Sequence, residues 1–370
     1  MGGMLVIIVI ILLFSSLVIL HEWGHFMAAK RNGVEVEEFG MGFPPKVWGR
    51  MWRGTLYTIN LLPLGGFVRL KGEDSADARP GTFGGASFGV KTKILLAGVV
   101  MNLLTAVVIL YPLCVVGLPA LGASFEPGFL RPTYAQPKQL ILAEVEASSP
   151  AQKAGLKRGD YVLTANGQKL ETDEALRNFT KAHAGTEVTL HVRSRGDERD
   201  VAVKLRDPGS KEGYLGVVGQ QVYKLRYDPL QAVVASVYVT GALFVATIVG
   251  VVQLIINLPT LVMGIFSHDV PQAAQAASGP LGIVFILKSI SSLGLSYIFL
   301  FMANIAVALA AFNVLPLPAL DGGRWAILAV QKVFKRQIGA EVEAKIHTIG
   351  FMALIGLMLL ISVYDLRKFF

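Results

Sequence analysis

Two histidines and a glutamate lie together near the start of the chain, in the order His21-Glu22-Trp23-Gly24-His25. Histidines at positions i and i+4 share one face of a helix, so both imidazoles can reach a single zinc ion. The glutamate between them is close enough to take a proton from the attacking water of a hydrolytic site. The spacing therefore predicts a zinc site with His21 and His25 as ligands and Glu22 as general base.

The motif lies at the end of an apolar stretch, Met4–Leu20. A helix of about 20 residues is needed to cross the hydrocarbon core, so this helix is expected to continue through the motif toward Ala29. Ionisable side chains within a span are costly and mark functional sites. The alternative is a helix end anchored at the membrane interface by His, Glu and Trp, but anchoring does not require this spacing.

A catalytic zinc site needs three protein ligands, so a third must come from elsewhere. The other histidines lie outside the apolar spans or at the start of the last one: His183, His191, His268 and His347. Asp321 is a better candidate, because it follows Pro316 and Pro318, which break a late apolar span. The alternative for Asp321 is an N-cap of the next helix. The otherwise incomplete zinc site favours the ligand.

Composition and hydropathy place these residues in a membrane protein. Of the 370 residues, 53% are hydrophobic and 16% are charged, whereas soluble proteins carry about 25% charged residues. About four transmembrane helices are expected: Met4–Ala29, Ile94–Leu118, Leu295–Leu315 and Thr348–Val363. The net charge of +8 comes from basic residues that flank these spans, as cytoplasmic loops do, and does not indicate nucleic-acid binding.

The segment Lys30–Lys93 holds ten Lys or Arg residues and is therefore expected in the cytoplasm. The active site then lies toward the cytoplasmic side. Within this segment, Thr55–Leu62 and Gly66–Leu70 resemble short strands separated by Pro63–Gly65. We expect a β-hairpin that rests on the membrane surface.

The segment Leu140–Leu205 is as charged as an ordinary soluble domain. Its apolar and polar residues alternate as in strands, on both sides of a predicted helix at Thr172–His183, which predicts a small α+β domain. One span separates it from the basic loop, so it is expected outside the cytoplasm. The stretch Pro229–Ser267 carries no charge and could cross the membrane zero or two times. Zero is favoured, and one crossing is excluded if Asp321 and the histidines meet at one depth.

Together, HEWGH in the first span, NVLPLPALDGG at Asn313–Gly323 and the inserted domain resemble the site-2 protease family of intramembrane zinc metalloproteases, especially its bacterial, sigma-regulating members. Further matches are FGMGFP (Phe39–Pro44), LPLGGFVRLKGE (Leu62–Glu73) and Ser278-Gly279-Pro280. The resemblance implies Zn²⁺ bound by His21, His25 and Asp321, with Glu22 as base, in a multi-pass protein of the bacterial inner membrane.

The resemblance also implies how substrate is held. Asn313, with Pro316 beside it, would hold an unwound substrate. The hairpin would pair with substrate as an added strand through Gly66, Phe67, Val68, Arg69 and Leu70. The implied substrates are single-span membrane proteins, such as anti-sigma factors, or remnant signal peptides.

The inserted domain resembles a PDZ domain, and it has room for one where the best-known members carry two. Gly213 and the residues after it look like a carboxylate-binding loop for peptide C-termini: Tyr214, Leu215, Gly216 and Val217. The alternative is a plain packing strand. The expected division is 1–120 for the first membrane region, 121–225 for the PDZ-like domain, 226–294 for a membrane-associated connector and 295–370 for the second membrane region.

Two other functions compete with the protease. A membrane scaffold or inactive homologue could use the PDZ-like domain alone, but it would not need an intact set of zinc ligands. A transporter could also contain broken helices and buried acids, but no internal repeat is visible and four spans are few.

Overall fold

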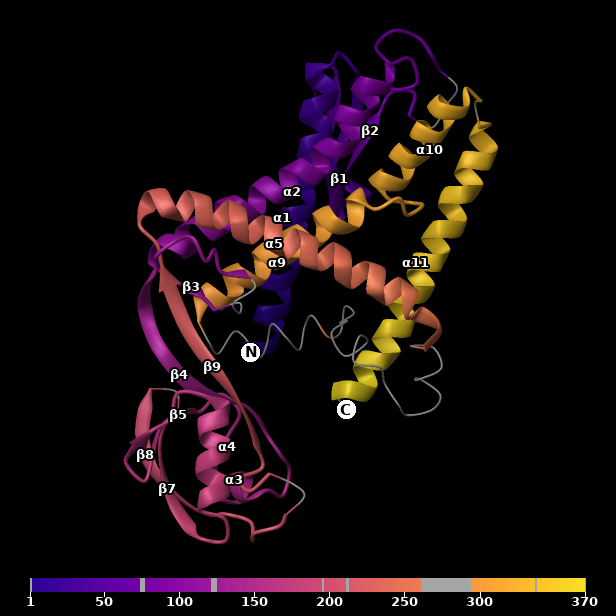
Figure 1. The fold of residues 1–370 in the computed structure, drawn as a ribbon. Helices are drawn as coiled ribbons and strands as arrows, with labels where there is room; N and C mark the ends of the chain where they lie inside the picture. Colours follow the sequence, from indigo (N-terminus) through magenta and orange to yellow (C-terminus); the bar gives the residue numbers. More distant parts are fainter. Residues whose placement is uncertain are drawn as a thin grey trace. The chain divides into compact units, whose positions relative to one another are not determined.

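The computed structural model describes residues 2–73, 77–120, 125–194, 196–210, 213–260, 282, 294–336 and 338–369 (Figure 1). The chain divides into two compact units. The first contains Met1–Tyr111, Ser236–Ser291 and Ile298–Phe370, and the second contains Pro112–Ala235 and Ser292–Tyr297. The expected zinc site therefore lies within the first unit, and the segment that is expected to be PDZ-like lies within the second.

Long apolar helices dominate the described part of the membrane region. They are α1 (Gly2–Arg31), α2 (Phe88–Val116), α5 (Pro229–Ile256), α9 (Leu295–Val314), α10 (Asp321–Phe334) and α11 (Ala340–Phe369). Among the described residues, all of these except α10 are long and apolar enough to cross a membrane. A helix suits that environment because it satisfies its own backbone hydrogen bonds. The four expected spans each coincide with one of these helices, and α5 is a fifth candidate.

Helix α5 covers most of the uncharged stretch for which zero crossings were favoured. It is one continuous helix of 28 residues, which is enough for a single crossing. One face is buried through Ala232, Ala235 and Val239, while Val245 and Val249 are exposed. Figure 1 draws α5 running across the direction of α1 rather than alongside it. The number of crossings here stays a prediction.

Helices α1 and α2 approach each other closely where the zinc motif lies. A side chain at Gly24 would collide with the backbone carbonyl of Ala97 in α2. Small residues allow such close approach between membrane helices. The glycine of the motif therefore brings α2 against the face of α1 that carries the two histidines.

The basic segment between the first two spans forms strands β1 (Val36–Trp52) and β2 (Thr55–Leu70). The expected hairpin between Thr55–Leu62 and Gly66–Leu70 is wrong in its pairing. Both lie within β2, and Gly40 of β1 lies opposite both Phe67 and Thr58. The start of β1 therefore runs between the two parts of β2. Local alternation identifies extended segments but cannot choose their partners.

The turn between these two parts of β2 is held against α1. Gly65 has a φ of 70°, a left-handed conformation that glycine adopts easily. The buried Ser15 of α1 donates to the Pro63 carbonyl at 2.5 Å and accepts from the Gly65 N–H at 3.4 Å. Phe26 of α1 also packs edge-on against Phe39 of β1, with ring centroids 5.4 Å apart. These contacts fix the sheet on the helix that carries the zinc motif.

The second unit contains a sheet with the strand order β3-β9-β4-β5-β7-β8, with β6 paired to β5. The strands are β3 (Leu118–Pro119), β4 (Thr133–Val145), β5 (Tyr161–Ala165), β6 (Gln168–Lys169), β7 (Glu187–Ser194), β8 (Asp197–Lys204) and β9 (Val217–Arg226). Two helices accompany them: α3 (Pro150–Lys153) and α4 (Asp173–Ala182). Leu176 and Phe179 of α4 join the buried core of this sheet. An α+β domain is thus present. Helix α4 lies within the expected helix Thr172–His183, and Thr172 is its N-cap.

Candidate metal centre

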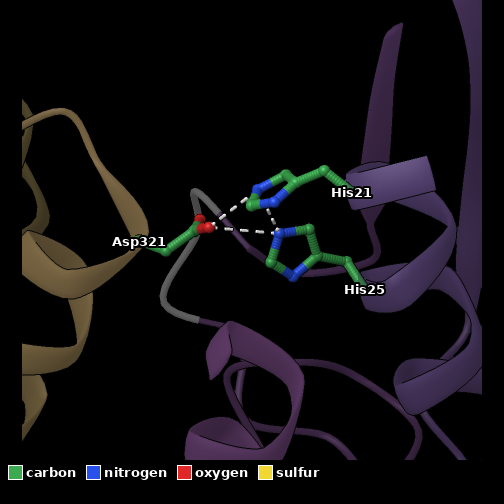
Figure 2. Close-up of side chains that lie close together, drawn as sticks. All are labelled: His21, His25 and Asp321. Carbon is green, nitrogen blue, oxygen red and sulfur yellow. Dashed lines mark hydrogen bonds and ion pairs between the residues drawn. The ribbon is translucent and has the colours of Figure 1, made fainter. Parts of the chain in front are cut away.

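His21, His25 and Asp321 converge in the first unit, although 296 or more residues separate the aspartate from the histidines along the chain (Figure 2). The Asp321 Oδ2 atom lies 3.1 Å from His21 Nε2 and 3.2 Å from His25 Nε2. The two Nε2 atoms are 3.1 Å apart. Two imidazole nitrogens and one carboxylate oxygen therefore surround a single point.

Helix α2 supplies the groups behind the two imidazoles. The Nδ1 atom of His25 lies 2.8 Å from the carbonyl oxygen of Ile94, and the Nδ1 atom of His21 lies 3.0 Å from the amide of Asn102. Both histidine side chains are buried. Ile94 and Asn102 are eight residues apart and so share one face of α2. Each imidazole is anchored through Nδ1 and directs Nε2 toward Asp321.

Between Ile94 and Asn102 on the same face lies Gly98, which keeps the space in front of the imidazoles open. A β-carbon at this position would lie 2.5 Å from both His25 Nε2 and His21 Cε1. The space beside the donor atoms therefore depends on the absence of a side chain here. Sequence reasoning missed both Gly98 and Asn102, because nothing in α2 alone indicates which face meets the histidines.

We expect Gly98→Ala to disturb this centre without unfolding the chain. The added methyl group meets the ends of two imidazole rings, which can rotate away, and a displacement of about 1 Å at such a site typically costs ~100-fold in rate. Zinc content and cleavage rate should both fall. Gly89→Ala in the same helix is the matched control, because a β-carbon there meets nothing within 4 Å. Equal zinc content in the two variants would contradict the role given to Gly98.

Asp321 is positioned by the break between α9 and α10. It is the first residue of α10, and the N-cap is Leu320, without a side-chain capping bond. The alternative of an Asp321 N-cap is therefore wrong in this structure. Ala319 has a φ of 72°, and its N–H donates to His347 Nδ1 at 2.8 Å. His347, dismissed as a ligand from the sequence, instead holds the turn that presents Asp321.

The charge state of Asp321 suits a metal ligand. Its carboxylate lies within hydrogen-bonding distance of both imidazoles, and hydrogen bonds donated to a carboxylate favour its ionised form. A carboxylate that stays ionised is ready to coordinate a cation.

Glu22 is half-buried and lies on the side of α1 that faces β2. Val68 of β2 offers a backbone hydrogen-bonding group to its carboxylate, and a β-carbon built on Gly66 would lie 3.7 Å from Glu22 Cγ. The segment Gly66–Leu70 is paired with β1 on one side. In the part of the chain that the structure describes, no strand covers its other side. An open strand edge thus passes directly beside the candidate base.

A polar cavity of about 500 Å³ opens beside Asp321. Its charged and polar lining includes Glu73, Arg324, Glu343 and His347. Glu73 forms an ion pair with Arg324 of α10 and accepts the Leu70 N–H at 3.2 Å. This residue therefore connects the end of β2 to the helix that begins with Asp321, and the cavity reaches Asp321 itself.

Asn313 and Pro316 are the residues expected to hold the substrate. Asn313 is half-buried near the end of α9, where its side chain donates to the Leu309 carbonyl at 3.0 Å. Pro316 is exposed in the loop before α10. Neither makes a described hydrogen bond to the His21–His25–Asp321 group, so their roles remain predictions.

The donor set fits zinc. Two neutral imidazole nitrogens and one carboxylate oxygen are the three protein ligands of many catalytic zinc sites, which keep a fourth position open. The space in front of Gly98 is consistent with such an open position. Fold and site together define a metalloprotease whose metal centre is built between apolar helices.

Comparison with known proteins agrees with that class. Peptidase family M50 matches residues 9–357. A Clostridium perfringens (strain 13 / Type A) protein, named a putative zinc metalloprotease, is 34% identical over 97% of this chain and 98% of its own length. Zinc metalloprotease RasP of Geobacillus kaustophilus is 28% identical over 98% of each chain. Regulator of sigma-W protease RasP of Bacillus subtilis is 26% identical over 98% of this chain and 99% of its own.

The chain therefore belongs to peptidase family M50, the family of site-2 proteases. The expected family, the zinc cofactor and the assignment as an intramembrane metalloprotease are confirmed. The chain is a multi-pass membrane protein. The PDZ-like character of the insert, the orientation in the membrane and the roles of individual residues stay predictions.

Proposed function

We propose that this protease cleaves other membrane proteins within or next to their membrane-spanning segments, using His21, His25 and Asp321 to hold zinc. The observation that carries the proposal is the position of the three donor atoms. Two of them belong to α1, a helix apolar enough to span the bilayer, and the third lies beside that helix. A site on such a helix is accessible to substrates that are themselves in the membrane rather than to soluble proteins.

In this proposal Glu22 is the general base and acid. His21, His25 and Asp321 would hold zinc, which when bound would supply a Lewis acid for the scissile carbonyl and for the attacking water. The Glu22 carboxylate accepts the proton of the attacking water and later delivers it to the leaving amine. The imidazoles keep their orientation because α2 fixes both Nδ1 atoms.

The open edge of β2 is the proposed binding site for the substrate backbone. A membrane-spanning helix hides its carbonyls in internal hydrogen bonds, so it must unwind before hydrolysis. An unpaired strand edge can supply replacement bonds to the extended chain. The nearness of Gly66 and Val68 to Glu22 supports this role for the segment. Its residues are Gly66, Phe67, Val68, Arg69 and Leu70. Asn313 and Pro316 are proposed to hold the other side of the unwound segment.

The proposed substrates are single-span membrane proteins of a bacterial inner membrane, such as anti-sigma factors, or remnant signal peptides. The name of the Bacillus subtilis relative, a regulator of sigma-W protease, supports the first class. Membrane proteomes of cells with the active protein and with Glu22→Gln should differ in a small set of single-span proteins, which accumulate uncut in the variant. Identical proteomes would contradict the proposal.

A groove in the second unit supports the proposed binding of peptide C-termini. Its volume is about 370 Å³. One wall is α4, with Leu176, Arg177, Thr180 and Lys181, and the other is Gly213–Val217. Tyr214, Leu215 and Gly216 form the loop before β9, and Val217 begins that strand. Such a loop can hold a terminal carboxylate through its backbone N–H groups. Lys181 of α4 carries the complementary charge, whereas Arg177 is paired with Asp173 in the same groove.

The proposed orientation places the active site toward the cytoplasm and the PDZ-like domain outside. The parity of crossings then requires that Pro229–Ser267 crosses an even number of times, most simply zero. One crossing would separate Asp321 from the histidines by about 30 Å. If α5 does cross, a second crossing must follow it before α9.

Cysteine labelling tests this topology. After Cys114 is replaced by alanine, Asp228→Cys and His268→Cys are each expected to react with a membrane-impermeant reagent applied from outside. His268 lies outside the described residues, but its side of the membrane is fixed by the parity argument. Labelling of one of the two positions from the cytoplasmic side alone would contradict either the parity or the shared metal site.

A further inference from the structure

Asn102 is a fully buried polar side chain that touches a candidate zinc ligand from behind. It lies on α2 with none of its surface exposed, and its amide is 3.0 Å from His21 Nδ1. As drawn, the nitrogen Nδ2 faces the imidazole, and the oxygen Oδ1 has no hydrogen-bond partner among the described residues. A buried acceptor without a partner costs about 1–3 kcal/mol.

The chemistry of His21 decides which end of the amide must face it. A neutral imidazole carries its proton on one nitrogen only. If Nε2 uses its lone pair toward a metal ion, Nδ1 must carry the proton and can only donate. An N–H group facing the Asn102 NH₂ would be repelled, whereas Oδ1 would accept. The oxygen and nitrogen of an asparagine are told apart by such partners.

His25 gives an independent example of the same arrangement in this chain. Its Nδ1 atom lies 2.8 Å from the Ile94 carbonyl oxygen, which can only accept. Nδ1 of His25 is therefore the protonated nitrogen, and Nε2 is free to bind the metal. Ile94, Gly98 and Asn102 follow each other at four-residue intervals. One face of α2 thus offers a carbonyl acceptor, an open space and a side-chain amide to the two imidazoles.

We propose that Asn102 is a positioning residue that fixes the tautomer and ring orientation of His21 by accepting its Nδ1–H through Oδ1. The proposal rests on the metal site of the proposed function and extends it to the layer behind the ligands. A neutral amide does this without adding another negative charge beside Glu22 and Asp321. Partners of this kind typically contribute 10–100-fold to metal affinity.

The test is zinc affinity, measured by chelator competition on the purified full-length protein in detergent. Asn102→Leu keeps a similar volume and removes the acceptor, so zinc should bind about 10–100-fold more weakly. Asn102→Asp keeps an acceptor and removes the donor, so zinc affinity should stay close to that of the unchanged protein. Asn304→Leu is the matched control, because Asn304 also lies on an apolar helix but donates to the Leu300 carbonyl at 2.9 Å.

Asn102→Asp separates the two orientations of the amide. If Nδ2 were the group that His21 needs, aspartate would weaken zinc binding at least as much as leucine, and the proposal would be overturned. Unchanged affinity in Asn102→Leu would overturn it as well. Should the leucine variant not fold, the comparison of Asn102→Asp with the unchanged protein still decides. Absence of zinc binding in the unchanged protein would instead remove the metal site itself.

Discussion

Replacing Glu22 with glutamine is expected to stop peptide cleavage while leaving zinc bound. The amide has the size of the carboxylate but cannot take a proton from water, and loss of a general base typically costs about 10²–10⁴-fold in rate. Glu22 is not among the three converging donors, so zinc content should stay at one equivalent. The measurement is the cleavage rate of a single-span model substrate, with zinc measured on the same preparation.

The zinc content and the thermal stability of the Glu22→Gln variant are the controls for this experiment. A variant that keeps both zinc and thermal stability but cannot cleave isolates the proton-transfer step. Cleavage at a rate near that of the unchanged protein would show that another group is the base. Loss of zinc together with activity would place Glu22 among the ligands, although the described donors that converge are His21, His25 and Asp321.

Replacing Asp321 with alanine is expected to remove most of the bound zinc. The Asp321 oxygen lies within 3.2 Å of both histidine Nε2 atoms, and its loss leaves two ligands where a catalytic zinc site uses three. Activity should fall with zinc content.

Asp228→Ala is the matched control for Asp321→Ala, because Asp228 is a true helix cap. Its Oδ1 atom accepts the N–H groups of Leu230 and Gln231 at 3.0 Å. Loss of that cap should cost about 1 kcal/mol in the free energy of unfolding and spare the zinc. If Asp321→Ala behaved in the same way, the ligand assignment would be wrong.

Much of the site could be predicted from sequence because its spacing is local. The separation of His21 from His25 is one helical turn, and the prolines before Asp321 mark a broken span. The apolar runs likewise predict the helices, because about 20 apolar residues have few alternatives in a membrane. Short-range spacing and hydropathy are therefore enough to predict these features.

The remaining parts depend on contacts between distant segments. The start of β1 lies between two parts of β2, and alternation within Thr55–Leu70 cannot reveal that third segment. Gly98 and Asn102 matter only because Gly24 brings α2 against α1. His347 matters only because α11 returns to the turn at Ala319. Such contacts are decided by packing rather than by periodicity.

The competing functions are weakened by the same geometry. A scaffold or inactive homologue needs no convergence of His21, His25 and Asp321, nor a glycine that keeps the space before them open. A transporter would have no use for a carboxylate at Glu22 set beside an open strand edge. Of the three candidate functions, only that of a peptidase requires all of these features.

The most direct test of the central claim is the position of the cut. The purified protein should be mixed in lipid vesicles with a single-span substrate, and the new termini should be identified by mass spectrometry. The account predicts a cut within the membrane-spanning segment or at its edge, dependent on zinc and absent with Glu22→Gln. A cut confined to the soluble part of the substrate, away from the membrane, would contradict it.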